Sequence, residues 1–309
     1  MMGDSSHDLK WLPEKPSEPL PSDCCGTGCV PCVFDLYEED LKLWEEKTKQ
    51  GPVQAVQCDT QDDVEPAISP AQYTSFVIDS ITNVSSDSKI YRFKIPGNKS
   101  FGLNIGQHLI LRGEVNGEVI TRQYTPISTL DLIGYFDVLI KIYQNGKMSS
   151  YIKTWNIGDK IEWRGPFGTF SYKPNKFQRI IMFAAGTGLA PMLQIIQSIV
   201  CNKDEDTFVR LIFCCRTYED ILLKSTLNEF AAYWNFTVCY VLSQEPNTSI
   251  HRYGEEVHYG RLDEDLVVKE TTPVRSNTMI LICGTKSFDK DIIKYITKTG
   301  YTKDCYFKF

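Results

Sequence analysis

Seven residues in the first half of the chain bring three kinds of side chain together. The segment Arg122–Ser128 reads Arg-Gln-Tyr-Thr-Pro-Ile-Ser and is predicted to follow directly on a strand, with Pro126 fixing the turn. A guanidinium pairs with two phosphate oxygens at once, and an aromatic ring can cover a planar ligand. This set suits a flavin dinucleotide, which has a pyrophosphate, a planar ring and a hydroxyl-bearing chain. The alternative is an ordinary strand end with a surface arginine.

A second candidate is the segment 146–149, Gly-Lys-Met-Ser, which begins a helix predicted to run to about Trp155. A serine at a helix start commonly caps it, and the N–H groups and dipole there attract anions. The segment is therefore predicted to hold the pyrophosphate from the side opposite Arg122. The alternative is a plain capped helix.

Two further candidates come later in the chain. Gly186-Thr-Gly-Leu-Ala-Pro191 lies between a predicted strand and a predicted helix. Ligands of parallel sheets bind at the carboxyl ends of the strands, and glycines let the backbone approach a dinucleotide. Cys283-Gly284 ends a later strand, where a small polarizable side chain would lie beside a nicotinamide. A buried free cysteine is otherwise a core residue.

The elements that must position these motifs follow two different patterns. From about residue 71 to 174, short runs of β-branched and aromatic residues are separated by turn signals. This spacing favours an antiparallel barrel, and Asn116-Gly117 is the strongest hairpin signal. The predicted strands cover 73–81, 90–95, 107–112, 136–143 and 160–164.

From residue 175 to 309, strands alternate with helices, which indicates a parallel sheet covered on both faces. The predicted fold is thus all-β followed by α/β: an antiparallel Greek-key barrel that binds FAD, then a doubly wound sheet that binds a nicotinamide dinucleotide. The predicted strands are 180–184, 208–214, 237–242 and 279–283, and the predicted helices are 191–199, 221–233 and 287–299.

Residues 1–50 form a Cys-rich segment with a helix predicted over 35–49, and residues 51–70 are predicted to be a linker. Cys29 and Cys32 have the pair spacing of a zinc site, but Cys24 and Cys25 do not supply a second such pair. We predict no metal site and expect these thiols to be unligated or to bind a partner. A zinc site and redox exchange are the alternatives.

Composition and charge limit the class of protein. The 309 residues suffice for two domains, no apolar run reaches the ~18 residues of a membrane span, and the N-terminus lacks a signal peptide. The first 70 residues carry a net charge of −10 and the rest +4. The basic excess suits an acidic protein partner and is too small to indicate nucleic acid. We expect a monomer in the cytoplasm, with the mitochondrion as the alternative.

The order of the motifs is more specific than any one of them. With Gly-Pro-Phe-Gly at 165–168 and an aromatic C-terminus, residues 73–309 resemble the ferredoxin-reductase superfamily and, within it, NADH-cytochrome b5 reductases. The Cys-rich stretch resembles the oxidoreductase-like domain that precedes some of these reductases. The resemblance implies an enzyme that moves a hydride from NADH to FAD and then single electrons to a haem acceptor such as cytochrome b5. The alternatives are an iron–sulfur or quinone acceptor, or an interaction protein that acts through its N-terminal cysteines.

The resemblance also implies roles for individual residues. Thr125, Lys141 and Cys283 would be catalytic: Thr125 matches a residue of the flavin motif, Lys141 matches a residue that lines the flavin, and Cys283 matches the cysteine near the hydride path. The flavin side would comprise Arg122, Tyr124, Thr125, Ser128, Leu139, Lys141, Gly146, Lys147, Met148 and Ser149. The nicotinamide side would comprise Gly186, Thr187, Gly188, Pro191, Cys283, Gly284 and Phe309.

Two departures from the family pattern concern the nicotinamide side. The segment 285–288 reads Thr-Lys-Ser-Phe where the family often has a proline run. The segment 242–244 reads Leu-Ser-Gln where the cytochrome b5 reductases have an acid that disfavours NADPH, and Arg216 could meet the additional phosphate. NADH is the predicted reductant, and NADPH is the alternative.

Overall fold

The computed structural model describes residues 15, 16, 18, 19, 33–50, 66–97, 99, 101–129 and 132–309. The chain divides into two compact units, Met1–Glu65 and Pro66–Phe309. In the first unit, helix α1 (Val33–Gln50) confirms the helix predicted over 35–49. The four clustered cysteines lie outside the described residues, so what the sequence indicates about them stays a prediction.

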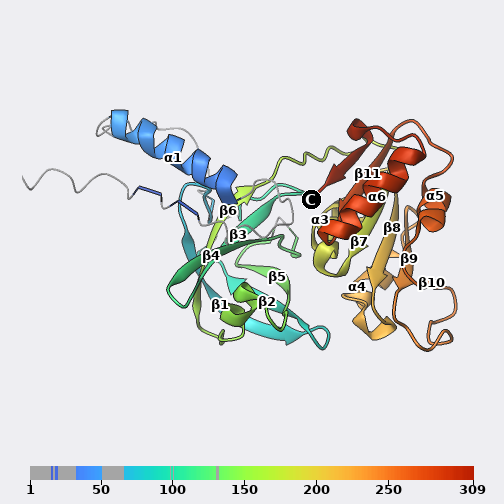
Figure 1. Cartoon of the computed structure of the whole chain (residues 1–309), viewed down its shortest axis with the longest axis horizontal. Coiled ribbons are helices and arrows are strands. Elements are labelled where there is room, and N and C mark those ends of the chain that lie inside the picture. The colour runs from blue at the N-terminus through green and yellow to red at the C-terminus, as the bar shows by residue number, and fades with distance from the viewer. Residues whose placement is uncertain are drawn as a thin grey trace, which may run out of the picture. The chain divides into compact units, whose positions relative to one another are not determined.

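The first half of the second unit is an antiparallel barrel of six strands (Figure 1). Their order is β4-β3-β6-β1-β2-β5, and an isolated bridge between Pro126 and Val138 joins the end of β4 to β5. The first and last strands therefore meet, which confirms the predicted barrel. The strands are β1 (Thr74–Asn83), β2 (Ser88–Lys94), β3 (His108–Val115), β4 (Glu118–Tyr124), β5 (Tyr135–Lys141) and β6 (Lys160–Phe167).

The barrel core is aromatic. Phe93 stacks on Phe136 with ring centroids 5.0 Å apart, and Trp163 meets Phe136 edge-on at 5.9 Å. Helix α2 (Lys147–Ile152) covers one side of β3, where a Cβ at Gly113 would come within 2.4 Å of the Tyr151 ring. The glycine therefore allows α2 to pack directly on the strand.

The second half is a parallel sheet of six strands with the order β10-β9-β8-β7-β11-β12. The chain adds β8, β9 and β10 on one side of β7, and β11 and β12 on the other. The carboxyl ends of β7 and β11 thus form a topological switch point, where sheets of this kind bind ligands. The strands are β7 (Arg179–Ala185), β8 (Phe208–Cys215), β9 (Phe236–Leu242), β10 (Glu256–Tyr259), β11 (Thr278–Cys283) and β12 (Tyr306–Lys308).

Helices cover both faces of this sheet, as predicted. Met182 of β7 belongs to a buried cluster with α3 and α4, whereas its neighbour Phe183 belongs to a cluster with α5 and α6. Alternate residues of a strand point to opposite faces, so one strand supplies both cores. The helices are α3 (Leu189–Val200), α4 (Lys224–Phe230), α5 (Glu264–Thr271) and α6 (Lys286–Lys298), with short 3₁₀ turns η2 (Gly186–Gly188), η3 (Tyr218–Asp220) and η4 (Lys303–Cys305).

The barrel and the parallel sheet pack on each other through apolar side chains. Leu139 of β5 and Phe170 belong to the same buried cluster as β7 and α3, and half-buried Ile90 and Ile127 pack against it. A continuous core therefore holds the two lobes of this unit together. None of the helices that the structure describes is long and apolar enough to cross a membrane.

Candidate functional site

Some of the predicted site residues lie where the barrel meets the carboxyl edge of the parallel sheet. The turn η2 follows β7 directly and contacts β5 of the barrel as well as β8 of the sheet. Lys141 is the last residue of β5, and Cys283 is the last residue of β11. The structure thus brings Lys141 of the predicted flavin side to the same boundary as the Gly-Thr-Gly turn and Cys283 of the predicted nicotinamide side.

Two glycines explain why the backbone of this turn has its shape. Gly186 has φ +54°, a left-handed conformation that strains other residues. A Cβ at Gly188 would lie 2.1 Å from the carbonyl oxygen of Cys283, so η2 can approach β11 this closely only with glycine there. An alanine at 188 would separate the two strand ends that form the switch point.

Helix α3 begins directly at this turn, where the Leu189 N–H donates to the carbonyl oxygens of Gly186 and Thr187 and Pro191 has no N–H. Its N-cap is Gly188, and no side chain of the described residues caps it. A Cβ at Gly186 would meet no described atom within 4 Å, so space is open beside the turn. The positive end of the helix dipole favours an anionic ligand in this space, such as a dinucleotide phosphate.

The nicotinamide-side residues include a neutral thiol and a buried carboxyl. Burial, with a smaller contribution from the charge of Asp289, raises the pKa of Cys283 to about 12. The thiol therefore stays protonated and is no thiolate nucleophile at neutral pH. Burial also raises the pKa of Asp289 to about 6, although Lys308 and the Gly284 N–H act against it.

Phe309 ends the chain against the same boundary. Its N–H donates to the carbonyl oxygen of Ile282 in β11 at 3.0 Å, and its ring lies 5.3 Å from that of Phe170. The terminal aromatic is therefore held by both the sheet and the segment that follows the barrel.

The flavin motif begins inside a strand. Arg122 and Tyr124 lie in β4, so the prediction that the motif follows the strand is wrong at its first residues. Tyr124 meets Trp163 edge-on at 5.9 Å, and burial raises its pKa well above the ordinary value. Ser128 accepts a hydrogen bond from the Asp137 N–H at 3.2 Å, which fixes the end of the motif to β5.

The segment 146–149 differs from its predicted form. The N-cap of α2 is Gly146, and the Ser149 hydroxyl accepts a hydrogen bond from the Tyr143 N–H at 3.0 Å, so the predicted serine cap is wrong. Met148 is buried in the barrel core. The Lys147 ammonium pairs with Glu118 at 2.7 Å. Any contact of Met148 with a cofactor would therefore be through its backbone.

Gln194 joins the two lobes and was missed by sequence reasoning. Its side-chain oxygen accepts from the Gly106 N–H at 2.9 Å, and its side-chain nitrogen donates to the Pro126 carbonyl at 2.9 Å. The residue is only 5% exposed. A polar side chain in α3 thus fixes the flavin motif to the helix that begins at the Gly-Thr-Gly turn.

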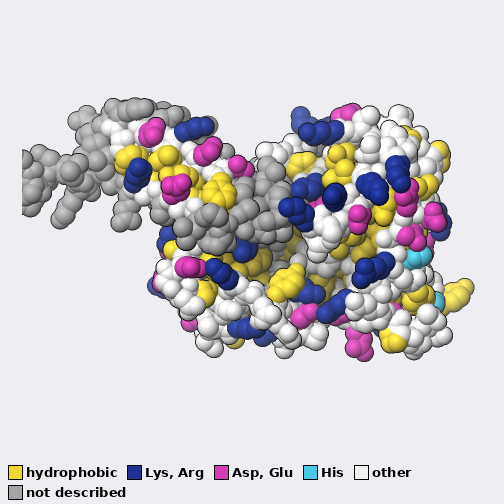
Figure 2. All heavy atoms as spheres, viewed as in Figure 1, with side chains coloured by type: hydrophobic (Ala, Val, Ile, Leu, Met, Phe, Trp, Pro, Cys, Tyr) yellow, Lys and Arg dark blue, Asp and Glu magenta, His cyan; other side chains and the backbone are white. Residues whose placement is uncertain are grey.

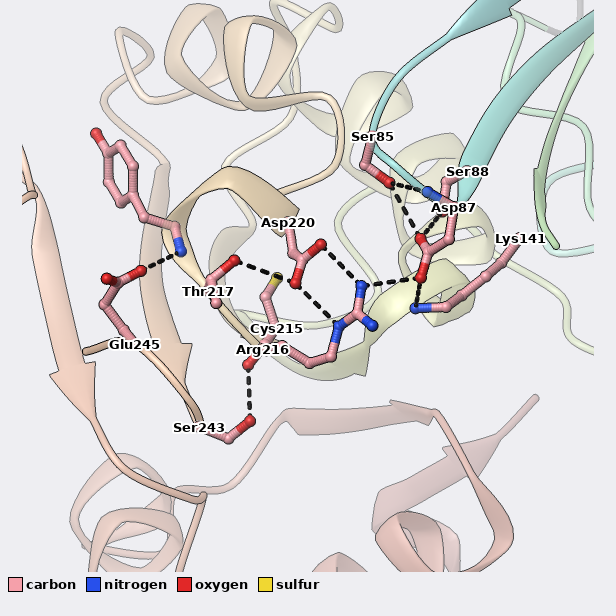
Figure 3. A network of polar contacts seen from close by, with 11 residues as sticks. Ser85, Asp87, Ser88, Lys141, Cys215, Arg216, Thr217, Asp220, Ser243 and Glu245 are labelled. Atoms are coloured by element: carbon pink, nitrogen blue, oxygen red, sulfur yellow. Dashed lines mark hydrogen bonds and ion pairs between the residues drawn. The ribbon is translucent and has the colours of Figure 1, made fainter. Parts of the chain in front are cut away.

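A network of ion pairs forms a second connection at the same boundary (Figure 3). The Asp87 carboxylate, just before β2, contacts the Lys141 ammonium at 3.1 Å and the Arg216 guanidinium at 2.8 Å. Arg216 follows β8 and also makes two hydrogen bonds of 2.9 Å to Asp220. Lys141, predicted to be catalytic, is therefore paired with an acid that sequence reasoning did not single out.

The donor set fits the two cofactors that the motifs suggest. Arg122 and Lys141 are cations on the barrel side, and Tyr124 supplies an aromatic ring. The turn at Gly186, with open space beside it, leads directly into α3. In the described part of the chain, no group of three or more His, Cys, Asp or Glu side chains is arranged to hold a metal ion.

Three family models match the chain. An oxidoreductase FAD-binding domain covers residues 75–172, and an oxidoreductase NAD-binding domain covers residues 182–294. A third, the N-terminal region of oxidoreductase-like proteins, covers residues 10–51. With the antiparallel barrel and the parallel sheet, these matches define an FAD- and NAD-dependent oxidoreductase with the ferredoxin-reductase fold.

Relatives narrow this class. The chain is 45% identical over 310 residues to the NADH-cytochrome b5 reductase-like protein of Mus musculus, which covers 97% of this chain and 96% of that protein. It is 43% identical over 308 residues to the Homo sapiens protein of the same description, with 99% and 98% covered. The cytochrome b5 reductase domain of Ulva prolifera nitrate reductase superposes with a TM-score of 0.71 at 27% identity, over 79% of this chain and 100% of that one. The chain belongs to the NADH-cytochrome b5 reductase family.

Proposed function

We propose that the protein passes electrons from NADH through FAD to a haem protein of the cytochrome b5 type. The observation that carries this proposal is the junction of the Thr125–Pro126 segment with α3 through Gln194, beside the turn that packs on Cys283. Two binding regions that meet at one boundary can hold a nicotinamide and a flavin next to each other. Proximity and orientation are the main protein contributions to hydride transfer.

Individual residues would divide the work of binding. Arg122 would pair with the FAD pyrophosphate, Tyr124 would flank the ring, and Thr125 and Ser128 would position the sugar chain. The start of α3 and Thr187 would face the nicotinamide dinucleotide. FAD, when bound, supplies acceptance of a hydride and release of single electrons.

The protein itself would position the cofactors and exclude water during hydride transfer. The proton that the hydride carries would pass to solvent once two electrons have gone to the acceptor. Cys283 and Tyr124 both have raised pKa values because of burial, so neither changes its protonation state near neutral pH. The packed core at the boundary, with Leu139 and Phe170, would keep water from the reacting atoms.

The acceptor would be recognised at the surface. Residues 71–309 carry more basic than acidic side chains, and Figure 2 shows Lys and Arg spread over the visible face of both lobes of this unit. An acidic haem protein would be steered toward such a surface. An iron–sulfur protein or a quinone is the alternative acceptor.

Reduction of purified cytochrome b5, followed at the haem absorbance after addition of NADH, tests the acceptor. We expect faster reduction of cytochrome b5 than of a ferredoxin or a water-soluble quinone at equal concentration. Rapid reduction of one of the others, with cytochrome b5 left oxidised, would contradict the proposed acceptor.

Substitution of the flavin-side cation tests the cofactor site. Arg122→Ala should lower the FAD content of the purified protein several-fold, because one charge-assisted phosphate contact contributes about 1.5–3 kcal/mol. The control is Arg112→Ala, which removes a guanidinium paired with Glu162 on the same barrel. Equal FAD content in both variants, measured after heat release, would remove Arg122 from the site.

A further inference from the structure

The Asp87 carboxylate is contacted by donor groups of four side chains. One of its oxygens contacts Lys141 at 3.1 Å and Arg216 at 2.8 Å. The other accepts from the hydroxyls of Ser85 at 3.1 Å and Ser88 at 3.0 Å. An ammonium, a guanidinium and hydroxyls are the donors that proteins use to hold a phosphate group.

The position of this cluster matches the expected path of a dinucleotide. Arg216 directly follows β8, the second strand of the parallel sheet, and β8 contacts the Gly-Thr-Gly turn. In doubly wound sheets, the residues after the second strand read the sugar of the adenosine half, and an arginine there accommodates a phosphate. Lys141 supplies a second cation from the barrel side of the same boundary.

The carboxylate is held firmly as an anion and yet remains accessible. Burial alone would raise the pKa of Asp87, but hydrogen bonds from Lys141 and Ser88 and the charge of Arg216 outweigh it, so the pKa lies below its ordinary value. The side chains are 22% exposed in Asp87 and in Lys141 and 44% exposed in Arg216. Ion pairs at this exposure are weak enough for a ligand anion to replace them.

We propose that Asp87 acts as an internal competitor of the dinucleotide, occupying Lys141 and Arg216 until a phosphate group of the nucleotide takes its place. This inference rests on the proposed function and adds a step to nucleotide binding. Without nucleotide, the carboxylate neutralises both cations and joins the barrel to the sheet. With nucleotide, the phosphate oxygens take the two cations, and the Asp87 contact opens.

With a competing anion in the site, the apparent dissociation constant of a ligand equals its intrinsic value divided by the fraction of molecules in which the site is free. Removal of the anion should therefore strengthen binding. If Asp87 instead served only to orient Lys141 and Arg216, its removal would weaken binding, because the cations would lose their support. The sign of the change in the dissociation constant separates the two roles.

The experiment measures binding of NAD⁺ and NADP⁺, without turnover, by isothermal titration calorimetry on the FAD-loaded full chain. Asp87→Asn keeps the size of the side chain and removes its charge, and we expect a dissociation constant about threefold to tenfold lower than in wild type. If affinity rises for both nucleotides, the phosphate group that replaces Asp87 belongs to the pyrophosphate. If affinity rises for NADP⁺ alone, it is the 2′-phosphate.

The matched control is Asp79→Asn, which removes one carboxylate paired with Lys94 on the same barrel. It makes the same change in net charge and should leave both dissociation constants within about twofold of wild type. An equal gain in nucleotide affinity in Asp79→Asn would show that the effect comes from net charge alone, and it would overturn the proposal. Asp87→Ser, which keeps a hydroxyl, serves if the asparagine variant folds poorly.

The outcomes separate this inference from the proposed function. Suppose that wild type binds NAD⁺ and that Asp87→Asn binds neither NAD⁺ nor NADP⁺ more tightly than wild type does. Asp87 is then not a competitor, and the proposed function stands. If neither protein binds either nucleotide, the proposed function and the competition fail together.

Discussion

Two of the contacts that join the barrel to the parallel sheet differ in burial and charge. Gln194 is 5% exposed and uses neutral hydrogen bonds to Gly106 and Pro126. Arg216, by contrast, is 44% exposed and reaches Asp87 through an ion pair. A buried hydrogen-bonding group that loses its partner costs its full desolvation penalty, whereas an exposed ion pair contributes little. The first contact therefore fixes the lobes, and the second can open without unfolding the protein.

The largest effect should come from the buried contact. Gln194→Ala would leave the Gly106 N–H and the Pro126 carbonyl without partners at a packed boundary. We expect a loss of about 2–4 kcal/mol in the free energy of unfolding, measured by urea denaturation. Gln197→Ala, at a less buried position of the same helix, should cost less than about 0.5 kcal/mol. Equal losses in the two variants would contradict the role assigned to Gln194.

A buried carboxyl in the nucleotide-binding lobe tests whether burial decides how much a polar group contributes to the free energy of unfolding. Asp289 is 6% exposed, its Oδ1 has no hydrogen-bond partner among the described residues, and its pKa is raised to about 6. The protonated form is favoured in the folded state. The contribution of Asp289 to stability should therefore be most favourable below the ordinary pKa of 3.8 and be lost as the pH rises through about 6.

Asp289→Asn should remove this penalty. We expect the variant to be more stable than wild type by about 2 kcal/mol at pH 7, with the gain vanishing near pH 4, as measured by thermal unfolding across pH. Asp291→Asn, at an exposed position of the same helix, provides the control for loss of charge. A gain in Asp289→Asn that does not depend on pH would contradict the raised pKa.

The smallest effect should come from the exposed contact. Arg216→Gln should change the free energy of unfolding of the nucleotide-free protein by less than about 1 kcal/mol. The difference from wild type should shrink as NaCl is raised from 0.05 to 0.5 M, because salt screens exposed charges. A larger, salt-independent loss in urea denaturation would show that this contact also fixes the lobes.

Much of the fold could be predicted because its signals are local. Runs of β-branched and aromatic residues marked most strands, and Asn116-Gly117 marked the hairpin between β3 and β4. Strand β10, with four residues, and strand β12, with three, are too short to show a periodic pattern. Helix α5 was missed although Asp263 caps it, so a signal was present there.

The helix predicted over 221–233 shows how backbone geometry overrides composition. Ile221 is extended, and Leu223 has φ +53°, so the helix begins only at Lys224. It ends at Phe230, three residues before the predicted end. Nothing in the local pattern of apolar residues indicates a left-handed leucine.

The site could be predicted only in part, for a different reason. The motifs around Arg122 and Gly186 are contiguous in sequence, so their residue types are visible together. The residues that join them are not, because Gln194 and Pro126 lie 68 positions apart and Arg216 and Asp87 lie 129 positions apart. Such pairs have no local signal, and only the fold brings them together.

An absorbance spectrum of the purified protein, repeated without oxygen after addition of NADH, tests the central claim that this boundary joins a flavin to a nicotinamide. We expect a yellow protein with flavin bands that bleach on addition of NADH. A protein that stays colourless when FAD is supplied, or a bound flavin that NADH does not bleach, would contradict the account.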